Sequence, residues 1–308
     1  MNYKKNITKK IGTLTILLIL ILTSSCTGKL SRQNKDSKPI ITVTIEPQIY
    51  FTKAIAGDKF IVNSLIPKGV SPESFDPTPQ QLVTLEKSIA YLRIGYINFE
   101  LAWKNKINSI SPKMKIFDTS KGIDLIANEY EKIAVNKIST DTTKKSNNKT
   151  SINPHIWTSA VNALIIAKNT YKALCTLDKN DSAYYHYRYD SICKHIIHID
   201  SIVKKILSSS QEPHSFLVYH PTLSYFARDY KLHQISIEEE GKEPSTLRLK
   251  ELIEISKEEK VQVVLVQPEF DKRNAEIIAK QLGAAIKTID PLNEQWDKEM
   301  INIANSLK

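Results

Sequence analysis

Residues 40–65, which read IITVTIEPQIYFTKAIAGDKFIVNSL, contain the pattern that decides the fold. The apolar runs at 40–45 and 60–65 have the length and composition of buried strands, and the residues between them have helical spacing. A strand, a helix and a second strand in this order predict a parallel βαβ unit.

The same alternation continues along the chain. Helices are predicted near 79–87 and 99–110, and strands near 90–94, 114–117, 215–219, 233–237, 261–266 and 284–289. Two long helical segments, near 158–177 and 181–209, separate the first four strands from the last four, and the second segment contains no Gly or Pro. That segment is longer than most globular helices. We therefore predict an α/β protein of two lobes with mainly parallel sheets, joined by one long rigid helix.

The pattern also sets the expected domain boundaries, because each lobe then has roughly the usual size of a domain. A stretch rich in Lys, Ser, Thr and Asn at 136–151 is expected to form a mobile surface loop. The predicted segments are a lipoprotein signal peptide (1–25), a flexible tether (26–39), an N-terminal α/β lobe (40–178), a linking helix (179–210) and a C-terminal α/β lobe (211–308).

The first residues have the layout of an export signal. Met1 to Lys10 carries four lysines and no acid, and an apolar run follows from Ile11 to Leu22. This run is shorter than the roughly 20 residues needed to span a bilayer. The sequence Leu22-Thr23-Ser24-Ser25-Cys26 resembles a bacterial lipobox, in which the cysteine is acylated. We expect an exported protein anchored by lipid at Cys26 to the cell envelope, on the periplasmic face or the cell surface; a plain secretory signal or an uncleaved anchor is the alternative.

The charge of the chain does not indicate a nucleic-acid partner. Loss of residues 1–25 removes four lysines and no acid, so the formal charge falls from +10 to +6. No Arg-rich helix with interleaved aromatic residues is present in the sequence, so nucleic-acid binding is not expected. A mildly basic surface and a lysine-rich tether beside anionic lipid account for the remaining charge.

Two cysteines besides Cys26 invite the expectation of a disulfide in an exported protein. Cys175 lies near the end of one predicted helix and Cys193 well inside the next. If these helices fold back on each other, the two residues differ in axial height by roughly 13 Å. A disulfide needs Cα atoms within about 7 Å, so we predict two free, mostly buried thiols.

Four potential metal ligands stand in loops or where strands lead into helices. Glu73 lies in a Pro-bounded loop after the second strand, and His155 lies in an irregular segment that leads into a helix. His220 and Asp290 each follow a predicted strand, and Pro221 is expected to be the first residue of a helix. In open α/β sheets, ligands bind beyond the carboxyl ends of the strands.

The remaining histidines with a notable context are weaker candidates. His195 and His198 have a chelating spacing, but an exposed or half-buried helix face is the simpler interpretation. His186 stands in a Tyr-rich run and is expected to pack rather than to bind metal.

Over most of residues 40–308 the chain resembles the zinc and manganese solute-binding proteins of ABC importers. The matching segments are Ala56-Gly57-Asp58-Lys59, Gly69 to Thr78, Gly95 to Trp103 with Phe99-Glu100, Asn153 to Trp157, His220-Pro221-Thr222 through Tyr225-Phe226, Glu243-Pro244-Ser245, and Ile289-Asp290-Pro291-Leu292.

This resemblance implies a binding protein rather than an enzyme, with one metal ion held in the cleft between two lobes. It implies Glu73 and His155 as ligands from the first lobe, and His220 and Asp290 from the second. Zinc is the expected ion, and manganese is the alternative. The expected partner is an ABC transporter membrane permease. The protein is expected to be a monomer. The sequence departs from the family at Glu73, where histidine is usual, and it has no His-rich loop ahead of His155.

The sequence is also compatible with other functions. A lipid tether would also serve a surface adhesin built on the same fold. A cobalamin- or siderophore-binding protein of similar architecture is disfavoured by the set of matching ligand positions. A metal-dependent hydrolase is disfavoured because the sequence has no Gly-x-Ser-x-Gly, no His-Glu-x-x-His and no Gly-rich phosphate loop.

Overall fold

The computed structural model describes residues 38–127, 151–208, 215–238 and 242–308. The predicted signal peptide, Cys26, nearly all of the predicted tether and all but the last residue of the predicted loop at 136–151 lie outside the described residues. Residues 39–308 form one compact unit. No helix in the described part of the chain is long and apolar enough to cross a membrane.

The first lobe is built on a sheet of four parallel strands in the order β2-β1-β3-β4. Each strand leads to the next through a helix, as parallel pairing requires. The structure confirms the predicted strands and helices of this region to within two residues. The elements are β1 (Ile40–Val43), α2 (Glu46–Ala56), β2 (Ile61–Ser64), α3 (Pro79–Glu86), β3 (Ala90–Arg93), α4 (Asn98–Ile110) and β4 (Lys115–Asp118).

The second lobe repeats this arrangement with a parallel sheet in the order β6-β5-β7-β8. Its elements are β5 (Ser215–Val218), α8 (Ser224–Tyr230), β6 (His233–Ser236), α9 (Thr246–Glu258), β7 (Val263–Val266), α10 (Arg273–Leu282), β8 (Ala285–Thr288) and α11 (Trp296–Ser306). The predicted strands are confirmed, but the prediction that Pro221 opens a helix is wrong. The helix begins three residues later, at Ser224, so His220 lies in a loop between strand and helix.

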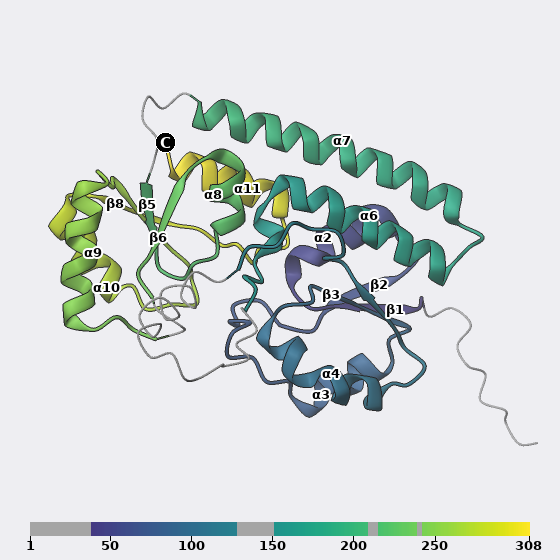
Figure 1. Ribbon diagram of the computed structural model, residues 1–308. Coiled ribbons are helices and arrows are strands. Elements are labelled where there is room, and N and C mark those ends of the chain that lie inside the picture. The colour runs from purple at the N-terminus through teal and green to yellow at the C-terminus, as the bar shows by residue number, and fades with distance from the viewer. Residues whose placement is uncertain (1–37, 128–150, 209–214, 239–241) are drawn as a thin grey trace, which may run out of the picture. The chain divides into compact units, whose positions relative to one another are not determined.

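A long helix, α7 (Ser182–Leu207), joins the two lobes (Figure 1). It follows the short 3₁₀ helix η2 (Ile156–Thr158) and α6 (Ala160–Leu177). Its 26 residues span about 39 Å at 1.5 Å per residue. Helix α7 packs against α2 and α6 on one side and against α11 of the second lobe. The predicted long joining helix is therefore confirmed.

A glycine caps α2 where this helix packs against α7. Gly57 follows the last residue of α2, and its φ of 61° lies in the left-handed region that favours glycine. A Cβ atom at this position would overlap the hydroxyl oxygen of Tyr184 on α7. Another residue would have to adopt this unfavourable φ and displace the Tyr184 side chain.

The second sheet divides its side chains between two hydrophobic cores. Leu217 and Val264 face a core with α9 and α10. Phe216, Val218 and Leu265 face the opposite side and join the larger core, which also contains residues of the first sheet. This division follows from the alternation of side chains along a strand. Because one core includes residues of both lobes, the lobes are packed together through apolar contact.

The two thiols of the described chain are free, as predicted. Cys175 on α6 and Cys193 on α7 form no disulfide and are half-buried rather than mostly buried.

Candidate metal centre

Three of the four predicted ligands lie together in the structure: Glu73, His155 and His220. One potential donor atom from each lies within 4.8 Å of the others. The histidines are 6% and 8% exposed, and Glu73 is half-buried. Within residues 38–127, 151–208, 215–238 and 242–308, this is the one group of three or more His, Cys, Asp or Glu residues close enough to share an ion. Two imidazoles and a carboxylate are ligands that zinc accepts.

The three side chains come from different segments of the fold. Glu73 lies in the loop between β2 and α3, and His155 immediately precedes η2, both in the first lobe. His220 follows the carboxyl end of β5 in the second lobe. The centre therefore draws its residues from both lobes, at the end of the sheets where ligands of α/β proteins usually bind.

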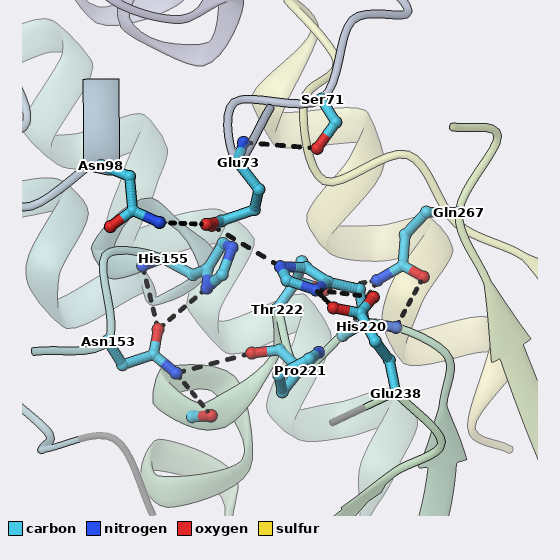
Figure 2. A network of polar contacts seen from close by, with 11 residues as sticks. Ser71, Glu73, Asn98, Asn153, His155, His220, Pro221, Thr222, Glu238 and Gln267 are labelled. Atoms are coloured by element: carbon cyan, nitrogen blue, oxygen red, sulfur yellow. Dashed lines mark hydrogen bonds and ion pairs between the residues drawn. The ribbon is translucent and has the colours of Figure 1, made fainter. Parts of the chain in front are cut away.

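Asn153 fixes the orientation of His155. The Oδ1 atom of Asn153 accepts a hydrogen bond from the main-chain N–H of His155 at 3.0 Å and lies 2.9 Å from the ring Nδ1 (Figure 2). With the Nδ1–H donating to Asn153, the free electron pair is on Nε2. Burial, followed by the charge of His220, holds the pKa of His155 well below its ordinary value. The ring is therefore neutral at pH 7, which is the form that binds metal.

Glu238 holds His220 in a similar manner. Both carboxylate oxygens of Glu238 lie 3.2 Å from Nδ1 of His220, and Glu238 is 3% exposed. The opposite nitrogen, Nε2, lies 3.8 Å from Oε1 of Glu73 and has no hydrogen-bond partner among the described atoms (Figure 2). A metal-binding histidine usually donates its other N–H to a carboxylate or carbonyl oxygen, and His220 has this arrangement.

Glu73 is held by a polar contact of its own. The Nδ2 atom of Asn98 donates to Oε2 of Glu73 at 2.8 Å, which leaves Oε1 on the side of His220. Burial raises the pKa of Glu73, the nearby His220 opposes this rise and Glu238 adds to it. A cation between these groups would favour the ionised carboxylate.

These side chains line a small hollow of ≈ 20 Å³. A volume of this size admits about one water-sized particle. The lining residues are Ser71, Pro72, Glu73, His155, Trp157, His220, Thr222, Gln267, Glu269, Phe270, Pro291 and Leu292. The hollow has room for a single ion rather than for an organic substrate.

The structure does not bring the carboxylate of Asp290, the fourth predicted ligand, into this cluster. Its Oδ2 atom accepts a hydrogen bond from Asn293 at 3.2 Å, and it is half-buried just after β8. The next residues, Pro291 and Leu292, line the hollow, so Asp290 stands at its margin.

The three histidines predicted to be weaker candidates lie on α7. His195 pairs with Asp297 at 3.1 Å, and His198 is exposed. His186 packs near the ring of Tyr171, with centroids 5.8 Å apart, and pairs with Asp190 at 3.7 Å.

The structure places two further carboxylates, which are not among the predicted ligands, at the centre. Glu238 follows β6 and Glu269 follows β7, each just beyond the carboxyl end of a parallel strand. The position that makes His220 and Asp290 candidates is therefore shared by both. Neither residue is a histidine or one of the ligand positions implied by the resemblance, so neither is predicted.

The chain is similar to known proteins of metal uptake. The family described as zinc-uptake complex component A, periplasmic, matches residues 41–305. The high-affinity zinc uptake system protein ZnuA of Bacillus subtilis is 25% identical over 298 residues, which cover 93% of this chain and 91% of that protein. The manganese ABC transporter substrate-binding lipoprotein PsaA of Streptococcus mitis is 26% identical over 293 residues, covering 90% of this chain and 88% of that protein.

A solved structure has the same fold. The crystal structure of a ZnuA protein aligns with a TM-score of 0.78 at 32% sequence identity, over 87% of this chain and 97% of that one. The two-lobed α/β architecture predicted from the sequence is therefore shared with metal-binding transport proteins.

Proposed function

Because this chain belongs to the family of periplasmic zinc-uptake components, we propose that it captures one divalent metal ion, zinc in the first place, and delivers it to the permease of an ABC importer. Proteins of this family are metal-binding components of uptake systems rather than enzymes. The metal is thus the cargo of the protein and not a resident cofactor.

One observation carries the proposal: Glu73 and His155 of the first lobe converge with His220 of the second. Each histidine has its Nδ1 occupied by a neighbouring oxygen, and each is buried and points its other nitrogen toward the cluster. An ion held here would be bound by residues of both lobes and would therefore connect them. An ion that binds the folded chain stabilises it by mass action.

The ligand types favour zinc over manganese. Imidazole is a good ligand for zinc, whereas manganese prefers oxygen, and zinc generally binds such a site more tightly. Glu73 supplies a carboxylate oxygen at the position where the family usually has histidine. We propose zinc as the main cargo and a residual capacity for manganese; relatives named for each metal are known.

We propose further that the protein works at the cell envelope, anchored by lipid at Cys26. Several relatives are named as lipoproteins, which supports this assignment. A lipid anchor would keep the protein close to a membrane permease and so raise its effective concentration there.

A thermal unfolding experiment tests the proposal. One equivalent of zinc is expected to raise the melting temperature of the purified wild-type protein. His155→Ala and His220→Ala are each expected to remove most of this rise, whereas His195→Ala and His198→Ala are not. A wild-type protein without the rise, or equal losses from the two pairs of variants, would contradict the proposed site.

A further inference from the structure

The proposed centre has one protein ligand fewer than zinc usually takes in a closed site. Glu73, His155 and His220 supply three donors, while zinc sites that hold the ion are four-coordinate. The cluster does point to a ligand, because His220 is 8% exposed and its Nε2 has no hydrogen-bond partner among the described atoms. A fourth donor must come from the wall of the hollow or from water.

Asp290 is poorly placed to be that donor. Its carboxylate lies outside the cluster, and Asn293 holds one of its oxygens. The charge of Lys68 acts on the same carboxylate. Its short side chain has only two rotatable bonds with which to change position.

Glu269 lies in the wall of the hollow itself, in the loop that follows β7. It is half-buried, and the charge of His220 acts on its carboxylate. Among the described residues, the main-chain N–H of Glu269 itself donates to this carboxylate, and no side chain donates a hydrogen bond to it or forms an ion pair with it. The side chain has only this local hydrogen bond to release when it turns, and it is one methylene longer than that of Asp290.

The residues on both sides of Glu269 fix its loop against His220. The side chain of Gln267 accepts from the main-chain N–H of His220 at 3.3 Å and donates to its carbonyl oxygen at 2.7 Å. The ring of Phe270 stacks on the imidazole of His220, with centroids 5.2 Å apart and an angle of 20°. The main-chain N–H of Phe270 closes the turn onto the carbonyl oxygen of Gln267 at 3.3 Å.

We propose that Glu269 is the fourth ligand of the captured ion and that it turns into the hollow when the ion binds. This inference rests on the proposed function, since it concerns the same centre. It gives a site of two imidazoles and two carboxylates in which the second carboxylate comes from the β7 loop. Asp290 then remains at the margin as a neighbouring charge.

The test compares three amide substitutions on the second lobe. Glu269→Gln removes the proposed ligand, Asp290→Asn removes the competing one, and Glu276→Gln on the exposed face of α10 is the matched control. The zinc dissociation constant is measured by competition with a chromogenic chelator, and the melting temperature without metal shows that each variant folds. X-ray absorption at the zinc edge counts the oxygen and nitrogen neighbours.

Glu269→Gln is expected to weaken zinc binding by at least about tenfold, comparable to the loss of a strong supporting contact. Asp290→Asn should weaken zinc binding less, and Glu276→Gln should leave zinc binding unchanged. Wild-type affinity in Glu269→Gln, or a loss in Asp290→Asn that is equal or larger, would overturn the assignment while leaving the metal-capture function intact. A failure of the function itself would appear instead as a wild-type chain that binds no zinc.

Discussion

Trp296 and Trp157 are joined across the two lobes by a hydrogen bond of 2.7 Å, from the indole N–H of Trp296 to the main-chain carbonyl oxygen of Trp157. The indole N–H of Trp157 donates in turn to the carbonyl oxygen of Pro291, also at 2.7 Å. Both rings are nearly fully buried. His155 stands two residues before Trp157 and packs against its ring with centroids 5.3 Å apart. The position of His155 relative to the second lobe is therefore held by these bonds.

Trp296→Phe is expected to destabilise the protein by about 1–3 kcal/mol, because a buried carbonyl oxygen loses its donor. Chemical denaturation of the metal-free protein measures this loss. The matched control is Trp103→Phe on α4, where the indole is half-buried and forms no described hydrogen bond. Equal effects of the two substitutions would show that the bond between Trp296 and Trp157 contributes little.

Replacement of Glu238 tests whether His220 needs an oriented ring. Loss of a carboxylate that supports a metal-binding histidine typically weakens metal binding by about 10–100-fold. We expect a loss of this size in Glu238→Ala and a smaller one in Glu238→Gln, whose amide oxygen still accepts from Nδ1. The zinc dissociation constants of the two variants show whether His220 needs this support. If Glu238→Ala binds zinc as the wild type does, the stacking of Phe270 and the main-chain bonds of Gln267 to His220 are enough to orient the ring.

The buried carboxyl of Glu100 predicts how stability depends on pH. Glu100 is 2% exposed, and burial raises its pKa from 4.5 to about 7, although the main-chain N–H of Ile94 donates to it at 2.8 Å. Between these two values the folded chain holds a proton that the unfolded chain has released. The contribution of Glu100 to stability therefore falls as the pH rises from about 4.5 to about 7.

Glu100→Gln should remove this contribution and so make the slope of stability against pH more positive than in the wild type, whatever its effect on the absolute stability. Unfolding midpoints of the metal-free wild type and the variant across this pH range provide the measurement. Glu276→Gln, at an exposed position, should keep the slope of the wild type. An unchanged slope in Glu100→Gln would mean that Glu100 has an ordinary pKa.

Glu73 determines how strongly the centre discriminates between zinc and manganese. Glu73→His should tighten zinc binding and abolish manganese binding, because it replaces an oxygen ligand with an imidazole. Glu73→Ala should weaken the binding of both metals. Titrations of each variant with the two metals measure the change. If Glu73→Ala binds zinc like the wild type, Glu73 is a loop residue, and Asp76 or a water molecule becomes the next candidate.

Much of the architecture could be predicted from the sequence, because strands such as 40–45 and the uninterrupted helix around 181–209 have strong local signals. The order of strands in each sheet could not be read in this way. It depends on which strands pair, and the pairs β1 with β3 and β5 with β7 join segments that are separated by another strand in the chain. Helix α8 also begins three residues later than Pro221 predicts, because this proline is compatible with a loop as well as with a first helical turn.

The metal centre was predictable in part. Loop and strand-end positions identified Glu73, His155 and His220, which the structure brings together. Glu238 and Glu269 each follow a predicted strand, but position along the chain does not show which acid turns toward the centre. The contact of Glu238 with His220 and the place of Glu269 in the wall of the hollow exist only in the folded lobe.

Anomalous X-ray diffraction from crystals of the zinc-loaded protein, recorded on both sides of the zinc absorption edge, tests the central claim most directly. The account predicts one strong peak, bound by a carboxylate oxygen of Glu73 and the Nε2 atoms of His155 and His220 at about 2.0–2.2 Å. A peak at His195 and His198, or no ordered zinc between the lobes, would contradict it.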